Sequence, residues 1–150
     1  IILLFFMFLL LFKSIKVSLI ALIPNVISIC LVLGFMGWFK IPLDMMTITI
    51  AAISMGMAVD NTIHYIYRYK KELMTDNNYS LAMRRTHMSI GFAMYYTSIT
   101  IIIGFLVLVF SNFIPSIYFG LLTSLAMLMA LLSSLILLPQ LLIAFKPFKN

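Results

Sequence analysis

The chain has 150 residues, of which 64% are hydrophobic and 9% are charged, and its mean hydropathy is +1.17. A water-soluble domain needs more polar surface than this composition provides, so the sequence predicts a membrane protein. The net charge of +6 does not indicate nucleic-acid binding, because the basic residues are spread along the chain instead of covering one polar face. The single cysteine, Cys30, excludes a disulfide framework or a cysteine metal site within this chain.

Five apolar segments are long enough, or nearly long enough, to cross about 30 Å of hydrocarbon as helices. The first, 1–12, looks like the end of a longer span, and we therefore expect the chain to be a fragment of a larger protein. The second, 17–39, contains Pro24, which a membrane helix tolerates when neighbouring groups bond the carbonyl that it frees. The remaining expected spans are 43–67, 89–110 and 117–145.

The connection 68–88 is strongly polar, and its part 79–87 has the pattern of a short amphipathic helix lying on the membrane surface. Basic residues follow the first, third and fifth spans, whereas the second span is followed by Lys40 alone. The positive-inside rule therefore places the loop 13–16, the connection 68–88 and the C-terminus in the cytoplasm.

An acidic residue, Asp60, interrupts the third expected span. Side chains on a helix turn by about 100° per residue, so positions three, four and seven apart share a face. Asp60 therefore shares a stripe with His64, and Asn61 lies on the neighbouring face. The members of this stripe are Thr49, Ile53, Gly56, Asp60, His64 and Tyr67.

Placing an acidic side chain at the centre of a span costs about 2.5–3.5 kcal/mol on insertion scales, and such residues are typical of ion paths and proton relays. The alternative for Asp60 is a structural hydrogen bond between two helices, which a neutral side chain can supply at lower cost. His64 either exchanges protons with Asp60 or anchors its helix near the lipid headgroups.

The fourth expected span carries three hydroxyl groups, on Thr97, Ser98 and Thr100. Hydroxyls at membrane depth can donate to a carboxylate or accept from its protonated form, so these residues are candidate partners of Asp60 in a relay. The alternative is that they bond to carbonyls of their own helix. Small residues expected to let helices pack closely are Gly56, Gly104 and Gly120.

Motifs of hydrolytic metal sites, phosphate-binding glycine loops and nucleophiles with a base do not occur in the sequence. We therefore expect neither an enzyme nor a bound cofactor or metal.

The segment GMAVDNTIHYIYRYKKE, which contains Asp60 and His64, resembles the intramembrane acidic motif of the resistance-nodulation-division (RND) superfamily. The downstream segment beginning TSITIIIGF resembles the two helices that follow this motif. The most similar group is the MMPL, or hydrophobe and amphiphile efflux, branch, which is related to Patched and to sterol-sensing-domain (SSD) proteins. The resemblance covers essentially the whole chain and implies an all-α membrane protein, a five-span bundle from the second repeat of a transporter.

The resemblance also implies a mechanism, which is proton antiport with efflux of hydrophobic or amphiphilic substrates across a bacterial inner membrane. The family's acidic relay residue matches Asp60, its preceding glycine matches Gly56, and its histidine matches His64. The TS of the next-to-last span matches Thr97 and Ser98. Some members carry a second carboxylate where this chain has Asn61, so a second acid would have to come from the first repeat.

The partners that the resemblance implies are membrane lipids, the N-terminal repeat of the same full-length protein and a lipid-like or hydrophobic substrate, but no nucleic acid. Coupling to Na⁺ instead of H⁺ stays open, as does the oligomeric state. Two other functions remain as alternatives. One is a sterol- or lipid-sensing module that regulates a partner without pumping, and the other is an accessory to protein translocation.

Overall fold

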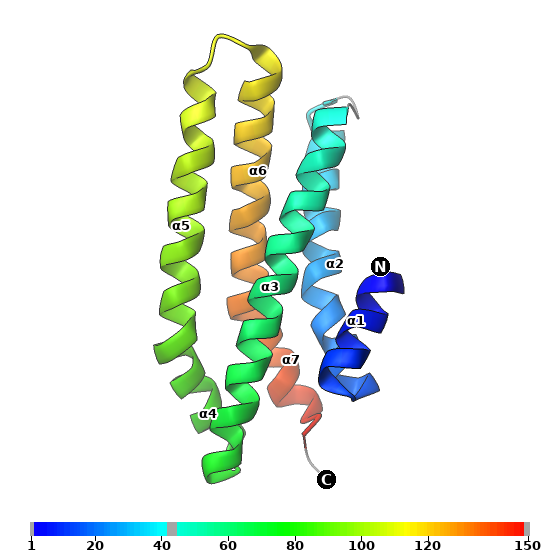
Figure 1. The fold of residues 1–150 in the computed structure, drawn as a ribbon, viewed down its shortest axis with the longest axis vertical. Helices are drawn as coiled ribbons and strands as arrows, with labels where there is room; N and C mark the ends of the chain where they lie inside the picture. Colours follow the sequence, from blue (N-terminus) through cyan, green and yellow to red (C-terminus); the bar gives the residue numbers. More distant parts are fainter. Residues whose placement is uncertain (1, 42–44, 149–150) are drawn as a thin grey trace.

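The computed structural model describes residues 2–41 and 45–148, and every regular element within them is a helix. Long helices run back and forth along one axis, with a short helix at the N-terminus (Figure 1). The α-helices are α1 (Ile2–Phe12), α2 (Ile15–Trp38), α3 (Met45–Asp76), α4 (Tyr79–Thr86), α5 (Phe92–Leu106), α6 (Ile114–Leu132) and α7 (Leu138–Phe145).

Three short segments with different hydrogen-bond spacing extend these helices. The π-helical segments η1 (His87–Gly91) and η3 (Ser133–Leu137) join α4 to α5 and α6 to α7. The 3-10 segment η2 (Val107–Phe110) ends α5. Because the segments are continuous with their neighbours, the described residues form five uninterrupted helices, in the order of the five predicted spans.

Three of these helices are long and apolar enough to cross a membrane, namely Ile15–Trp38, Tyr79–Phe110 and Ile114–Phe145. The helix α1 is apolar but has 11 residues, which is too short to cross alone. The helix α3 has 32 residues, and the polar and charged side chains in its second half make it less apolar than these three. The predicted all-α membrane bundle is confirmed. The start of the predicted span 43–67 lies outside the described residues, and the span boundaries stay predictions.

The short helix predicted over 79–87 corresponds to α4 in the structure, and its place on the membrane surface stays a prediction. The helix α4 begins after Asn78, whose side chain accepts hydrogen bonds from the backbone N–H groups of Ser80 and Leu81. It then packs against α3, buries Ala82 and Thr86, and continues through η1 into α5. The apolar face of α4 is therefore covered by protein, at least in part.

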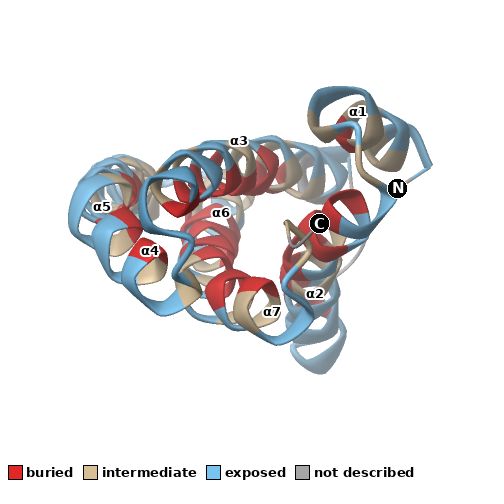
Figure 2. Cartoon of the chain, turned by 90° about the horizontal axis from the view of Figure 1, so that it is seen from below, coloured by how far each residue is buried: buried red, intermediate tan, exposed pale blue. Residues whose placement is uncertain are grey.

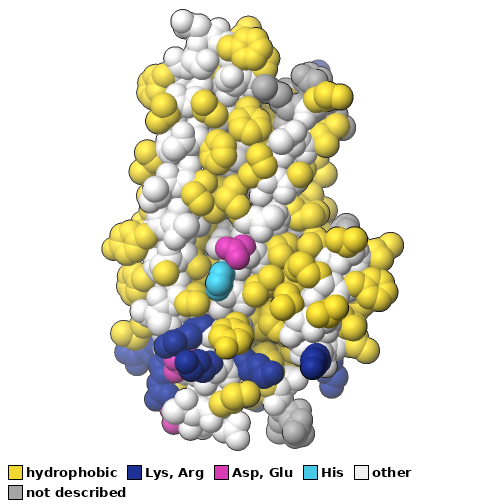
Figure 3. All heavy atoms as spheres, viewed as in Figure 1, with side chains coloured by type: hydrophobic (Ala, Val, Ile, Leu, Met, Phe, Trp, Pro, Cys, Tyr) yellow, Lys and Arg dark blue, Asp and Glu magenta, His cyan; other side chains and the backbone are white. Residues whose placement is uncertain are grey.

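The helix α6 occupies the centre of the bundle, where it packs against α2, α3 and α5 (Figure 2). A hydrophobic cluster that includes Tyr65, Tyr69 and Leu138 fills the end of the bundle near the C-terminus. A smaller cluster, which includes Ile50 and Leu122, fills the other end. Lys and Arg side chains gather at the C-terminal end, which we call the basic end (Figure 3).

Side chains of α2 and η3 bond the backbone around Pro24, which lies inside α2 and disturbs its hydrogen bonds. Asn25 Nδ2 donates to the carbonyl of Ala21 at 2.7 Å and to Thr62 Oγ1 of α3 at 3.2 Å. The carbonyl of Pro24 accepts from the hydroxyl of Ser133 at 3.0 Å. These bonds hold the backbone on either side of Pro24 and connect α2 to α3 and to η3.

Asn25→Leu is expected to lower the free energy of unfolding by about 1–2 kcal/mol, because it leaves a buried carbonyl and the Thr62 hydroxyl with fewer partners. Denaturation of the purified chain in mixed detergent micelles measures this change. Thr49→Val is the matched control, since the exposed Thr49 hydroxyl bonds to a carbonyl of its own helix. Equal destabilisation by both variants would contradict the role of Asn25.

Candidate proton-relay site

The polar stripe of α3 lies on the outside of the described bundle. The side chain of Asp60 is 69% exposed and that of His64 is 62% exposed, and Gly56 and Tyr67 are also exposed. We call these four residues the outward face of α3. A carboxylate and a histidine lie next to each other on a side of the molecule that is otherwise apolar or uncharged above the basic end (Figure 3).

Asp60 and His64 contact each other across one helical turn, with Asp60 Oδ1 at 3.3 Å from His64 Nε2. The imidazole can accept or donate a proton, so the pair is able to share one. An ionised carboxylate is costly when it faces hydrocarbon. Where this part of α3 lies within the membrane, its outward face therefore has to be covered by protein or to line a water-filled cavity.

Two residues predicted in the relay lie inside the bundle, away from Asp60. Asn61 is 9% exposed and Ser98 is fully buried. Within the described residues, neither Asn61 Nδ2 nor Ser98 Oγ has a hydrogen-bond partner. Both are thus polar groups of the bundle interior, and a role in proton transfer stays a prediction.

The hydroxyls of Thr97 and Thr100 are exposed and bond to their own helix, which was the alternative derived from the sequence. Thr97 Oγ1 donates to the carbonyl of Ala93 at 2.8 Å, and Thr100 Oγ1 donates to that of Tyr96 at 2.9 Å. Across the described part of the chain, no hydrogen bond connects either residue to Asp60. Their participation in the relay also stays a prediction.

The three glycines predicted to serve helix packing lie in different environments. A Cβ atom added at Gly120 would lie 2.5 Å from the carbonyl oxygen of Phe105 and 2.9 Å from Cβ of Leu108. Gly120 therefore marks a close approach of α6 to α5 and η2. At Gly56 and Gly104 an added Cβ would meet no described atom within 4 Å.

A histidine that sequence reasoning placed at the end of a surface helix connects three helices. The Tyr65 hydroxyl lies 2.9 Å from His87 Nδ1, and His87 Nε2 lies 3.0 Å from the carbonyl oxygen of Leu135. A neutral imidazole protonated on Nε2 satisfies both contacts, accepting from Tyr65 and donating to Leu135. His87 begins η1 and Leu135 lies in η3, so this bond joins the two π-helical segments.

Tyr65→Phe is expected to lower the free energy of unfolding by about 1 kcal/mol, and His87→Leu by about 2–3 kcal/mol, because the first removes one hydrogen bond and the second removes both. Thermal or detergent unfolding of the purified chain gives both values. Tyr67→Phe, at an exposed position of the same helix, should have almost no effect. The role of His87 would be refuted if His87→Leu were as stable as Tyr67→Phe.

A separate set of polar contacts orders the basic end. Arg68 pairs with Glu72 at 2.8 Å within α3, and Arg85 of α4 pairs with Asp76 of α3 at 2.6 Å. The Tyr69 hydroxyl donates to the carbonyl of Tyr79 at 3.0 Å. Burial raises the pKa of Tyr69, and the nearby Tyr79 adds to the rise, so this donor keeps its proton.

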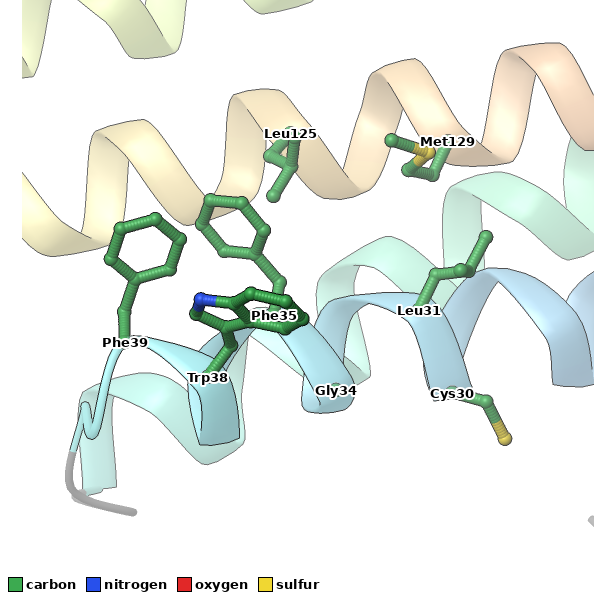
Figure 4. Close-up of a pocket in the computed structure, with 8 residues that line it drawn as sticks. All are labelled: Cys30, Leu31, Gly34, Phe35, Trp38, Phe39, Leu125 and Met129. Atoms are coloured by element: carbon green, nitrogen blue, oxygen red, sulfur yellow. The ribbon is translucent and has the colours of Figure 1, made fainter.

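An apolar pocket of about 560 Å³ opens between α2 and α6, toward the end opposite the basic end. The aromatic rings of Phe35, Trp38 and Phe39 line it from the end of α2, and Leu125 and Met129 face them from α6 (Figure 4). This lining is suited to contact with the hydrocarbon chain of a ligand. In contrast, no group of three or more His, Cys, Asp or Glu side chains that could hold a metal ion occurs in the described residues.

Comparison with known proteins places this arrangement in a family. The model of the MMPL family matches residues 1–148. A protein of Methanocaldococcus jannaschii named "Putative membrane protein MJ1562" is 34% identical over 92 residues, which are 61% of this chain and 24% of that protein. The chain thus spans a minor part of the length of this relative. No solved structure matches the chain. The resemblance seen in the acidic motif is confirmed, and the chain belongs to the MMPL family.

Proposed function

We propose that this chain is part of the membrane domain of a transporter, in which Asp60 carries a proton while the whole protein exports a hydrophobic or amphiphilic molecule. Membership of the MMPL family supports a membrane transporter-type role. The observation that carries the finer proposal is the exposed Asp60–His64 pair on the outside of an apolar bundle. Titratable groups inside membrane segments are functional candidates because keeping them there is costly.

The outward face of α3 is proposed to pack against the N-terminal repeat of the full-length protein. Covering this face would remove Asp60 and His64 from lipid. Gly56 supports such a contact, because it lies one turn from Asp60 with open space around it and lets a second helix approach closely. The repeat would also supply further hydrogen-bonding groups to Asp60.

Proton binding at Asp60 would then change the relative stability of two arrangements of the transporter. The neutral acid tolerates an apolar surrounding, whereas the carboxylate favours contact with water, His64 or a partner group. Moving one charge through the membrane potential contributes about 2.3 kcal/mol per 100 mV. Energies of this size shift a two-state equilibrium by more than tenfold, which is enough to couple proton entry to a conformational change.

The orientation proposed for this domain puts the basic end in the cytoplasm, in agreement with the positive-inside rule. The apolar pocket near Trp38 then opens toward the outer leaflet, a position that supports a lipid-like substrate. Parts of the protein outside this chain are proposed to select the substrate.

Transport by the full-length protein in proteoliposomes tests this function. A fluorescent lipid analogue is followed after a pH gradient, a Na⁺ gradient or no gradient is imposed. We expect transport under the pH gradient alone and its loss when a protonophore is added. Transport driven by Na⁺ alone would reject proton coupling. Absence of transport under every gradient, in a folded protein, would reject export and favour a lipid-sensing or translocation-accessory role.

A further inference from the structure

A polar pocket of about 480 Å³ opens at the basic end of the bundle. Three segments that are distant in the sequence form it, namely the turn between α1 and α2, the last turns of α3 and the segment after α7. Its polar lining includes Lys13, Ser14, Lys70 and Asn77, and its apolar lining includes Phe12 and Phe148. The fold, and not a local sequence run, therefore brings the two lysines to one cavity.

The positive charge of this pocket is not neutralised by the described residues. Among them, no carboxylate lines the pocket. The described carboxylates of Asp60, Glu72 and Asp76 each have another partner, and none of these pairs includes Lys13 or Lys70. Two lysines that share a cavity without a counter-charge create a local positive potential, which attracts an anion.

The neutral polar groups of the pocket are suited to the same ligand. Ser14 is the N-cap residue of α2, yet no capping hydrogen bond holds its side chain in place, so its hydroxyl can turn toward a ligand and donate to it. The amide of Asn77 adds further donors. Ammonium, hydroxyl and amide donors together match the several acceptor oxygens of a phosphate group.

The apolar part of the lining distinguishes between sources of phosphate. Phe12 and Phe148 provide surface that a free phosphate ion does not use, whereas a lipid can place its glycerol backbone and first methylenes there. Basic pockets on the cytoplasmic side of membrane helices are also where anionic headgroups bind. The combination of charge, donors and apolar wall favours a lipid.

We propose that this pocket binds the phosphate of an anionic phospholipid in the cytoplasmic leaflet, with Lys13 and Lys70 contacting the headgroup. The inference uses the proposed membrane orientation but does not require Asp60 to carry a proton. Lipid binding and gradient-driven transport are separate measurements, so either proposal can fail while the other holds.

Binding of tail-labelled phosphatidylglycerol and phosphatidylcholine to the full-length protein in detergent micelles tests the site. The wild type should prefer phosphatidylglycerol. The double variant Lys13→Ala with Lys70→Ala should bind it about tenfold more weakly or worse and lose the preference. The matched control is Lys16→Ala with Lys71→Ala, which removes the same charge from neighbouring positions that do not line the pocket, and it should stay within about twofold of the wild type.

Four results would count against the proposal. One is an equal loss in both double variants, which would indicate general attraction to the basic end. Another is equal binding of the two lipids by the wild type. The third is displacement of phosphatidylglycerol by millimolar inorganic phosphate with an affinity matching that of the lipid, which would make the free ion the ligand. Lys13→Arg with Lys70→Arg should retain binding, and weak binding by this folded variant would also count against a charge-based site.

Discussion

Asp60→Asn in the full-length protein is expected to reduce transport under a pH gradient to the rate measured without a gradient. Asparagine has nearly the shape of aspartic acid and keeps its hydrogen-bonding ability, but it cannot release and rebind a proton. Loss of coupling with normal folding is therefore the specific consequence of removing the titratable group. Reconstituted protein, matched for amount and orientation in the vesicles, gives the two rates.

Glu72→Gln is the matched control for this experiment. Glu72 pairs with Arg68 one turn away on the same helix, just as Asp60 pairs with His64, but it lies at the basic end. This change should leave gradient-driven transport close to the wild-type rate, because glutamine keeps the shape of glutamate and an oxygen that can still accept a hydrogen bond from Arg68. Gradient-dependent transport that persists in Asp60→Asn would refute the relay, and equal losses in both variants would point to damage of the helix as a whole.

Opposite changes in stability are expected from Gly120→Ala and Gly104→Ala. The Cβ atom added at Gly120 would lie 2.5 Å from a backbone carbonyl oxygen of Phe105, which cannot move without shifting α5 relative to α6. We expect a loss of about 1–3 kcal/mol in the free energy of unfolding. The same change at Gly104 meets open space, and the alanine should stabilise the helix by about 0.4–1 kcal/mol.

Unfolding of the purified chain in mixed micelles measures both variants under identical conditions. The chemical change is the same and both residues lie inside helices, so the difference isolates the contact that the new methyl group makes. Stabilisation of the chain by Gly120→Ala would show that α5 and α6 do not approach each other as described.

Helical periodicity correctly predicted which residues of α3 share a face, but not which face is covered. Asp60 and His64 share a side of the helix with Tyr67, while Tyr65 and Tyr69 fill the core. In a soluble helix the apolar stripe marks the inside. In a membrane both lipid and protein accept apolar side chains, so hydrophobicity alone does not separate the two.

The contacts that sequence reasoning missed depend on the tertiary structure. His87 bonds to a carbonyl of Leu135, 48 positions away, inside one of two π-helical segments. The local sequence does not distinguish a π-helical segment from the α-helix around it, because the helix on either side continues normally. The one available signal was a histidine at the start of an apolar span, a position where a hydrogen-bond partner is needed. Pro24 was more informative, since its need for neighbouring donors follows from its chemistry.

Labelling of the full-length protein with dicyclohexylcarbodiimide most directly tests the claim that Asp60 binds and releases a proton inside the membrane. This hydrophobic reagent modifies protonated carboxyl groups, and mass spectrometry of peptides locates the product. The proposed relay predicts modification of Asp60 that falls as the pH rises and is slowed by transported substrate, with Glu72 unlabelled. The proposed relay would be contradicted if Asp60 were not labelled at any pH that supports transport. It would also be contradicted if the extent of labelling did not change with pH or with substrate.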